Sequence, residues 1–204
     1  MKRSTAVKHL EEMAEVASDM HRRLHDSTIP WPLEELWVAG DLLGFADEFD
    51  TGAVVLVLDV PPDKAPWLAL NPGGEWVGEM LRLGKLPLQW CYRPQLWPVW
   101  NVEHRRLVRF YSATAGLDDA VIAALRTRRF DRLDFVEPTK AELTSQLQEE
   151  LIVSRRHLRL VLDRYWAPTW RKRHKGYAQD PEDHLYRAAM AVSDIADALD
   201  QLKG

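Results

Sequence analysis

The sequence predicts an α/β or α+β protein, in which a mixed sheet with flanking helices is followed by a C-terminal helical hairpin or bundle. Every strand-like segment lies before residue 138. From residue 139 onward, apolar residues recur at the three- and four-residue spacing of long helices. Strands that precede a run of helices are typical of this class. We therefore expect two domains, an α/β domain over residues 1–137 and a helical hairpin or bundle over 138–204.

The first element is an amphipathic helix over residues 4–25, with Ser4 or Thr5 as its N-cap. It ends before the prolines of residues 29–32, because a residue that precedes proline avoids helical geometry. The elements that follow are a strand over 34–39, a helical turn over 41–46, a strand over 53–59, a turn over 71–74, a helix over 75–83, strands over 86–92 and 105–112, a helix over 117–128 and a strand over 131–136.

Two of these strands have informative patterns. Residues 53–59 (AVVLVLD) form a continuous β-branched run, which predicts a strand buried on both faces. Residues 105–112 alternate instead, and this alternation predicts a strand with two unlike faces. One face would carry Leu107, Arg109 and Tyr111, and the other Val108 and Phe110.

The last third of the chain predicts two long helices. Thr139 and Glu142 form a capping-box pattern at the start of the first, which ends at Pro168. Residues 168–180 are expected to form a basic, aromatic loop. Pro181 and the two acids after it fit the first turn of the last helix, because acids there complement the helix dipole.

Composition excludes several classes of protein. The chain has 204 residues, of which 46% are hydrophobic and 28% charged, which is too apolar for a disordered chain. No apolar run approaches the roughly 20 residues of a membrane-spanning helix, and the first residues lack the apolar stretch of a secretory signal. The single cysteine, Cys91, excludes a disulfide framework and a cysteine-rich zinc site. We therefore expect a cytoplasmic protein without a membrane partner, a metal or another cofactor.

Charge is distributed unevenly. Residues 1–103 hold nine Lys and Arg against sixteen Asp and Glu, whereas residues 155–175 hold eight cations and one acid. The basic stretch is either a solvated helix face or a strip that contacts phosphate or nucleic acid. The net charge of −4 argues against a dedicated nucleic-acid binder. The acidic and basic parts could also attract each other between two copies, so a homodimer or another protein partner stays open.

The densest functional candidate is the segment over residues 165–187. Aromatic residues alternate there with cations, a combination that stacks on bases and holds phosphates in nucleotide and nucleic-acid sites. The alternative is that these aromatic residues close the base of the helical bundle. The candidate ligand-binding residues are Trp170, Arg171, Arg173, His174, Lys175 and Tyr177.

Acid–base chemistry is a weaker hypothesis for the same segment. Glu182, Asp183 and His184 crowd the start of a helix, where an acid and a histidine could transfer protons. The alternative is that the acids complement the helix dipole and the histidine is a surface residue. His174 and His184 could also meet across the loop as two metal ligands, although nothing in their spacing requires it.

The residues around Gly40 resemble the nucleotidyltransferase fold of the minimal and kanamycin-type transferases. In that family a strand ends in Gly-Ser, and an Asp-Ser-Asp-hydrophobic-Asp run follows about ten residues later. In this chain Asp41 stands in place of the Ser, and Asp50 with the next residue matches the leading Asp-Ser. The two metal-binding carboxylate positions fall on Gly52 and Val54.

This resemblance implies a transferase-like domain over residues 1–137 that has lost the usual metal site. Nucleotidyl transfer uses two divalent ions held by carboxylates, and neither Gly52 nor Val54 supplies one. The later strand over 105–112, where the family carries a third acid, also contains none. The chain further resembles an uncharacterised actinobacterial family that shares residues 170–189, and this second resemblance implies no mechanism.

We expect a catalytically degenerate binding or regulatory protein, whose ligand is a nucleotide, a nucleic acid or a partner protein. One alternative is a divergent transferase that uses Asp41, Asp50 and Asp59, the last of which ends a buried strand. Another is a different enzyme that uses Glu182, Asp183 and His184. A third is one member of a toxin–antitoxin or defence pair.

Overall fold

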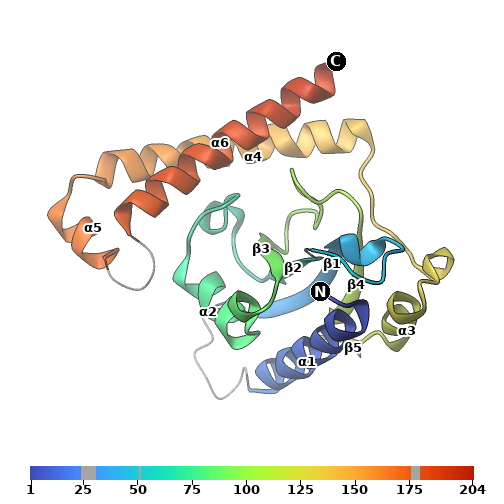
Figure 1. Cartoon of the computed structure of the whole chain (residues 1–204). Coiled ribbons are helices and arrows are strands. Elements are labelled where there is room, and N and C mark those ends of the chain that lie inside the picture. The colour runs from blue at the N-terminus through green and yellow to red at the C-terminus, as the bar shows by residue number, and fades with distance from the viewer. Residues whose placement is uncertain (24–30, 51, 176–179) are drawn as a thin grey trace. The chain divides into compact units, whose positions relative to one another are not determined.

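The computed structural model describes residues 1–23, 31–50, 52–175 and 180–204 (Figure 1). It consists of two compact units. The sheet unit contains residues 1–61 and 72–137, and the helical unit contains residues 62–71 and 138–204. In the described ranges, each helix is too short or too polar to cross a lipid bilayer.

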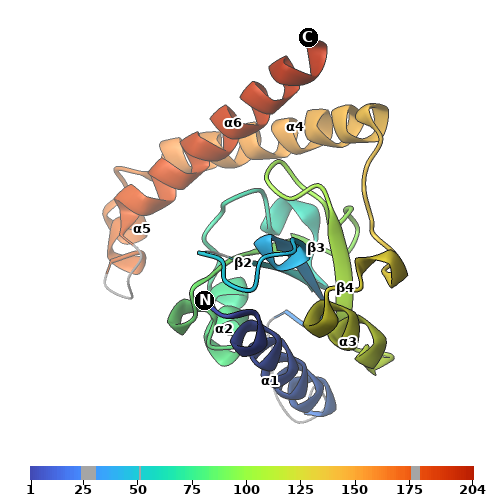
Figure 2. The same ribbon diagram turned by 45° about the vertical axis from the view of Figure 1, so that its right-hand side comes forward.

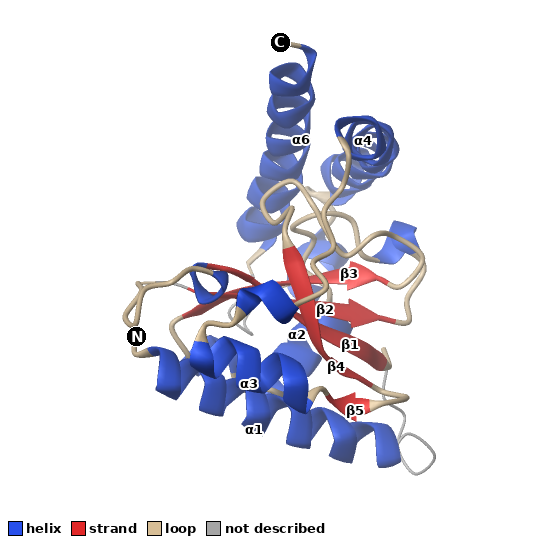
Figure 3. Ribbon diagram, turned by 90° about the vertical axis from the view of Figure 1, so that its right-hand side faces the viewer, coloured by secondary structure: helices blue, strands red, loops and turns tan. Residues whose placement is uncertain are grey.

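The sheet unit is built on a five-stranded mixed sheet, as predicted, with strand order β3-β2-β1-β4-β5 (Figure 3). Strands β2 and β3 are parallel and the other neighbours are antiparallel. All seven residues of β2 are buried, which confirms the prediction from its β-branched run. The strands are β1 (Leu33–Gly40), β2 (Gly52–Leu58), β3 (Leu88–Pro94), β4 (Leu107–Ser112) and β5 (Gly116–Leu117).

Helices α1 (Arg3–Arg22) and α2 (Pro72–Met80) cover the same face of the sheet. Tyr92, Leu56, Leu36 and Tyr111 lie in one row across four strands, so their side chains share a face. Tyr92 at one end of this row contacts α2, and Tyr111 at the other end lies beside Ser18 of α1. Helix α3 (Asp119–Thr127) packs beside α1 and is capped by the carboxylate of Asp118.

Helix α2 begins three residues earlier than predicted, because glycines 73 and 74 belong to the helix instead of to a turn. A Cβ atom at Gly74 would lie 2.6 Å from Tyr92, and one at Gly78 would lie 2.4 Å from Trp90. The glycines therefore allow the helix to approach two aromatic rings of β3 more closely than any side chain would permit.

Strand β4 does not have the predicted alternation. Tyr111 pairs with Leu36 and Arg109 pairs with Trp37, with an irregularity of register between these two positions. Because Leu36 and Trp37 are consecutive, their side chains point to opposite faces, and so do those of their partners. In β4 only Arg109 is exposed.

Two other local predictions were wrong. Lys2 is the N-cap of α1, and no side chain caps this helix, whereas Ser4 and Thr5 lie inside its first turn. Residues 131–136 form no strand: a 3-10 turn occupies Phe130–Arg132, and a single bridge joins Val136 to Leu107. The predicted turn between the first two strands is present as a 3-10 turn at Asp41–Leu43.

The helical unit contains an antiparallel pair of long helices, α4 (Lys140–Arg164) and α6 (Pro181–Lys203), as Figures 1 and 2 show. The capping box of Thr139 and Glu142 is present, as predicted. Residues 62–71 also belong to this unit, where buried Trp67 lies 3.4 Å from the carboxylate of Asp194. The predicted loop over 168–180 contains a short helix, α5 (Pro168–Arg173).

Candidate functional site

One end of the helical unit is strongly cationic. We call it the basic end, defined by seven exposed cations from the last turns of α4, from α5 and its C-terminal extension, and from the first turns of α6. Within the described ranges no carboxylate lies within 4.0 Å of any of them. They are Arg155, Arg156, Arg164, Lys172, Arg173, Lys175 and Arg187.

The opposite end of the same helix pair is acidic. Exposed or half-buried acids occupy the first turns of α4 and the last turns of α6, among them Glu142, Glu149, Asp194, Asp197 and Asp200. The net charge of the whole chain therefore hides a separation of charge within this unit. A ligand at the basic end meets a local field that the value of −4 does not describe.

The exposed face of α4 carries its cations in a line. Leu147, Ser154 and Val161, seven residues apart, are buried and mark the inner face. Arg155, Arg156 and Arg159 lie on the outer face. Arg155 and Arg156 are adjacent, and Arg159 lies about one turn, roughly 5.4 Å, further along the helix. Arg159 also pairs with Asp163 at 3.2 Å.

Trp166 ends this line directly after α4. Its side chain is 80% exposed, which is unusual for the largest apolar residue. The Trp166 ring stands edge-on to Tyr165, with ring centroids 5.0 Å apart. It therefore presents an accessible aromatic surface beside the cations.

Arg171 and Glu182 fix this aromatic pair. The Arg171 guanidinium carbon lies 5.0 Å from the Tyr165 ring centroid and 5.8 Å from that of Trp166. Glu182 Oε1 accepts hydrogen bonds from Arg171 Nη2 at 2.7 Å and from the Tyr165 hydroxyl at 3.1 Å. The bond from Arg171 lowers the pKa of Glu182, and the same bond raises the pKa of Arg171. The predicted phosphate ligand Arg171 thus already has an internal carboxylate partner.

Trp170, His174 and His184 form an inner cluster behind this surface. Trp170 stacks on His174 with ring centroids 4.2 Å apart, and His174 meets His184 edge-on at 4.6 Å. His174 Nδ1 lies 2.8 Å from the Trp170 carbonyl oxygen, so this nitrogen carries the proton and donates it. The arrangement is that of side chains closing the base of a helix pair. The two histidines meet, as the sequence suggested.

His184 is only 6% exposed, and its Nε2 has no hydrogen-bond partner among the described residues. Burial, and after it the charges of the nearby His174 and His157, lower the pKa of His184 to about 4. The imidazole is therefore neutral near pH 7.

The three residues of the acid–base hypothesis do not converge. Asp183 accepts a hydrogen bond from the backbone nitrogen of Asp180 at 2.9 Å and completes the capping box of α6. Glu182 points to Arg171, and His184 is buried. Consecutive helix residues face different directions, so this geometry gives no shared substrate position.

Three predicted ligand-binding residues remain, Arg173, Lys175 and Tyr177. Arg173 and Lys175 are exposed at the basic end. Tyr177 lies outside the described residues. In the ranges that are described, no three His, Cys, Asp or Glu side chains are grouped so that they could hold a metal ion.

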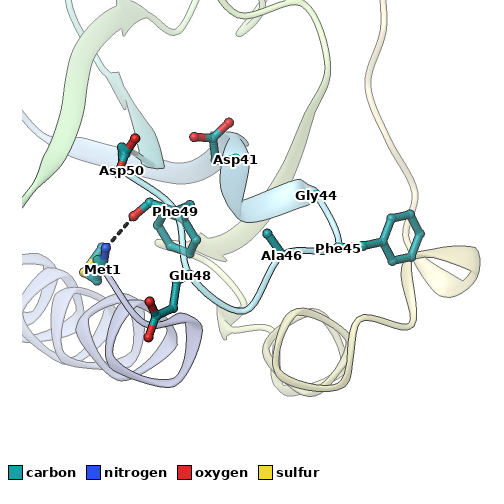
Figure 4. Close-up of a pocket in the computed structure, with 8 residues that line it drawn as sticks. All are labelled: Met1, Asp41, Gly44, Phe45, Ala46, Glu48, Phe49 and Asp50. Atoms are coloured by element: carbon teal, nitrogen blue, oxygen red, sulfur yellow. Dashed lines mark hydrogen bonds between the residues drawn. The ribbon is translucent and has the colours of Figure 1, made fainter.

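A separate cavity of about 450 Å³ lies beside the 3-10 turn that follows β1 (Figure 4). Asp41 and Asp50 both line it, and Figure 4 shows their carboxylates on the same side of the loop, with Glu48 turned away from them. The amino terminus of Met1 donates a hydrogen bond to the Phe49 carbonyl at the cavity wall. The structure thus brings together two of the three acids proposed for a divergent transferase.

The third of these acids, Asp59, is far from the cavity. Asp50 precedes the start of β2 and Asp59 follows its end, so the whole strand separates them. Seven strand residues span about 23 Å at 3.3 Å per residue. These three carboxylates therefore cannot share one metal ion.

The positions that match the family's metal ligands are filled by apolar core. A Cβ atom at Gly52 would lie 2.8 Å from Leu42 and 2.9 Å from Leu88. Val54 is completely buried. A carboxylate at Gly52 would have to displace Leu42 and Leu88, and one at Val54 would enter the buried core.

Comparison with protein families identifies the family of this chain. Residues 1–201 match the family described as "Domain of unknown function (DUF7711)". The chain belongs to the DUF7711 family. No curated protein and no solved structure matches it. The family match assigns no activity, and it does not support membership of a nucleotidyltransferase family.

Arg3 of this DUF7711 chain is a residue that the sequence analysis missed. Its side chain is only 4% exposed. The guanidinium donates hydrogen bonds to the carbonyls of Leu42 at 2.7 Å, Gly44 at 2.6 Å and Ala46 at 2.7 Å. It also lies 5.8 Å from the ring centroid of Phe130. Arg3 therefore holds the loop that forms the wall of the Asp41 cavity.

A signal for Arg3 was present in the sequence. Position 3 continues the apolar stripe of α1 through Val7 and Leu10, at spacings of four and seven residues. An arginine at such a position faces the interior, so it must find acceptors there. The identity of those acceptors follows only from the fold.

Proposed function

We propose that this DUF7711 chain is a non-catalytic binding or regulatory protein that contacts a nucleic acid through the basic end of its helical unit. The observation that carries the proposal is the group of seven exposed cations, which have no acidic partner among the described residues and lie beside the exposed ring of Trp166. Cations that neutralise backbone phosphates release condensed counterions, which is the main source of affinity for nucleic acids.

The arrangement on α4 supports an extended ligand over a single free nucleotide. The arginines at positions 155, 156, 159 and 164 extend along about 14 Å of α4, at 1.5 Å per residue, so that they form an elongated cationic array. Trp166 lies at the end of that array, where an unpaired base could stack on it. We therefore expect a single strand to bind more tightly than a duplex, in which the bases are already stacked.

The absence of nucleotidyl transfer is the second part of the proposal. It rests on the resemblance to the transferase fold and on the apolar filling around Gly52 and Val54. In this hypothesis the sheet unit keeps the architecture of a transferase without the carboxylate pair that would hold two metal ions.

Fluorescence anisotropy with labelled 20-nucleotide single-stranded RNA and DNA, and with the matching duplexes, tests the binding. The test variant replaces Arg156, Arg173 and Lys175 by Gln. A control variant replaces Lys85, Arg105 and Arg132 of the sheet unit by Gln. These three are also exposed, so the net charge changes equally.

The basic-end variant should lose affinity and the control should not. If the three replaced cations each contact a phosphate, the slope of log affinity against log salt becomes shallower by about 2, at roughly 0.7 per phosphate of a single strand. Equal losses in the two variants would show that net charge alone determines binding. No binding by the natural chain would contradict the proposal outright.

A further inference from the structure

A large groove in the sheet unit has no part in the proposed function. Its volume is about 980 Å³, and it runs between α1 and the segment from α2 to Leu86. We call it the α1–α2 groove. Its apolar lining residues are Met13, Val16, Met20, Trp76, Met80, Leu81 and Leu86.

The groove is long and open. The α1 residues along it extend from His9 to Arg23, which corresponds to about 21 Å of helix at 1.5 Å per residue. Three of its lining residues are methionines, and Met80 is 43% exposed. Methionine side chains adapt their shape to a bound apolar surface, and they are common where a protein accepts helices.

The two walls of the groove carry opposite charges. On the α1 wall, Glu12, Glu15 and Asp19 follow one another at spacings of three and four residues, and Arg23 stands at the end of the wall. Glu12 also pairs with Lys8 and His9, and Asp19 pairs with Arg22. Arg82 and Lys85 stand on the opposite wall, three residues apart. Both cations are exposed, and neither has an ion pair among the described residues. The α1 wall is therefore mainly acidic between Glu12 and Asp19, and the opposite wall is basic.

We propose that the α1–α2 groove binds an amphipathic helix of a partner protein. The apolar face of that helix lies on Met80 and the apolar side chains beside it, its cationic flank faces Glu12 and Glu15, and its acidic flank faces Arg82 and Lys85. Helices bind in this way when an apolar stripe fills a hydrophobic groove. A fatty acid carries only a negative charge, so it would leave the acids of the α1 wall without a partner even if Arg82 and Lys85 held its carboxylate. A helix that carries both charges matches both walls.

Two synthetic 16-residue peptides test this proposal. Both have leucines at spacings of four, three and four residues and the same numbers of Lys and Glu. In the segregated peptide all Lys lie on one flank and all Glu on the other, whereas in the mixed peptide each flank alternates. A helix can bind in a groove in either direction, so which flank faces the acidic wall is not fixed. The two peptides are therefore compared for the segregation of charge between their flanks. Labelled peptides are titrated with the full chain and followed by anisotropy.

The segregated peptide should bind roughly tenfold more tightly than the mixed one, because several rim ion pairs form together. Met80→Asp should abolish binding, and since Met80 is partly exposed the fold should survive, as circular dichroism can confirm. Equal binding of the two peptides, or binding of neither, would overturn the proposal.

A charge-reversal variant gives an independent test. Glu12→Lys with Glu15→Lys makes both walls basic, so this variant should lose the segregated peptide and gain one with Glu on both flanks. The control replaces two exposed acids outside the groove, Asp134→Lys with Glu149→Lys. It should change the affinity for neither of these two peptides. Displacement of the peptide by hexadecanoate, or a chain dimer that Met80→Asp dissociates, would assign the groove to another occupant and overturn the proposal.

Discussion

The buried guanidinium of Arg3 gives the sharpest prediction about stability. In Arg3→Met the carbonyls of Leu42, Gly44 and Ala46 lose a donor that lies within 2.6–2.7 Å. A buried acceptor left without its partner costs about 1–3 kcal/mol. The attraction between Arg3 and the ring of Phe130 is lost as well. Methionine restores part of the packing, so we expect the free energy of unfolding to fall by about 3–5 kcal/mol.

Urea unfolding, followed by circular dichroism and tryptophan fluorescence, measures this change. If the two units unfold separately, the transition of the sheet unit is the relevant one. Arg126→Met is the matched control, because Arg126 is 54% exposed and pairs with Glu11 at the surface, where an ion pair contributes at most about 1 kcal/mol. A loss below about 1 kcal/mol for Arg3→Met, or an equal loss in the control, would refute the account of the loop.

Three further predictions concern α2, the inner cluster and the aromatic surface. Gly78→Ala should lower the free energy of unfolding in urea by about 1–3 kcal/mol, because the added Cβ would lie 2.4 Å from Trp90. This loss is expected even though alanine favours helices. An unchanged or higher stability would contradict the close packing of α2 on β3. Burial and the two neighbouring histidines lower the pKa of His184 to about 4, against about 6.5 when unfolded. The unfolded chain therefore binds more protons between these values. Stability should be full above pH 6.5 and fall by up to about 3 kcal/mol as the pH drops to 4. The dependence of the free energy of unfolding on pH should be weaker in His184→Gln. An equal dependence in this variant and the natural chain would show that other groups cause it. Trp166→Ala should leave the melting temperature unchanged and lower the affinity for a single strand about tenfold. Trp166→Phe should retain most of that affinity. Equal affinities of the natural chain and the two variants would contradict a stacking role for Trp166.

Local sequence patterns predicted those parts of the fold that neighbouring residues determine. The β-branched run of β2 and the capping box at Thr139 both depend on residues close in the chain. The start of α2 could not be predicted, because its glycines serve a contact with β3 that only the folded chain creates. The register irregularity in β4 and the place of residues 62–71 beside α6 also depend on distant partners. That each compact unit folds as an independent domain stays a prediction.

The candidate site was predicted in composition but not in arrangement. The aromatic and basic segment was found from its residue types, yet pattern could not show that Trp170 and His174 pack inward while Trp166 is exposed. The net charge of −4 argued against nucleic acid, since a total does not reveal that acids and cations occupy opposite ends of one helix pair. The loss of the transferase carboxylates at Gly52 and Val54 could be predicted from the sequence, but the leucines that fill their place could not.

The salt dependence of single-stranded RNA binding tests the central claim most directly. If all seven cations of the basic end contact phosphates, the logarithm of affinity should fall against the logarithm of KCl concentration with a slope of about −5, at roughly 0.7 per phosphate. The variant that lacks Arg156, Arg173 and Lys175 should show a slope near −3. A slope close to zero in the natural chain, or the same slope in both proteins, would contradict the assignment of the basic end as a nucleic-acid interface.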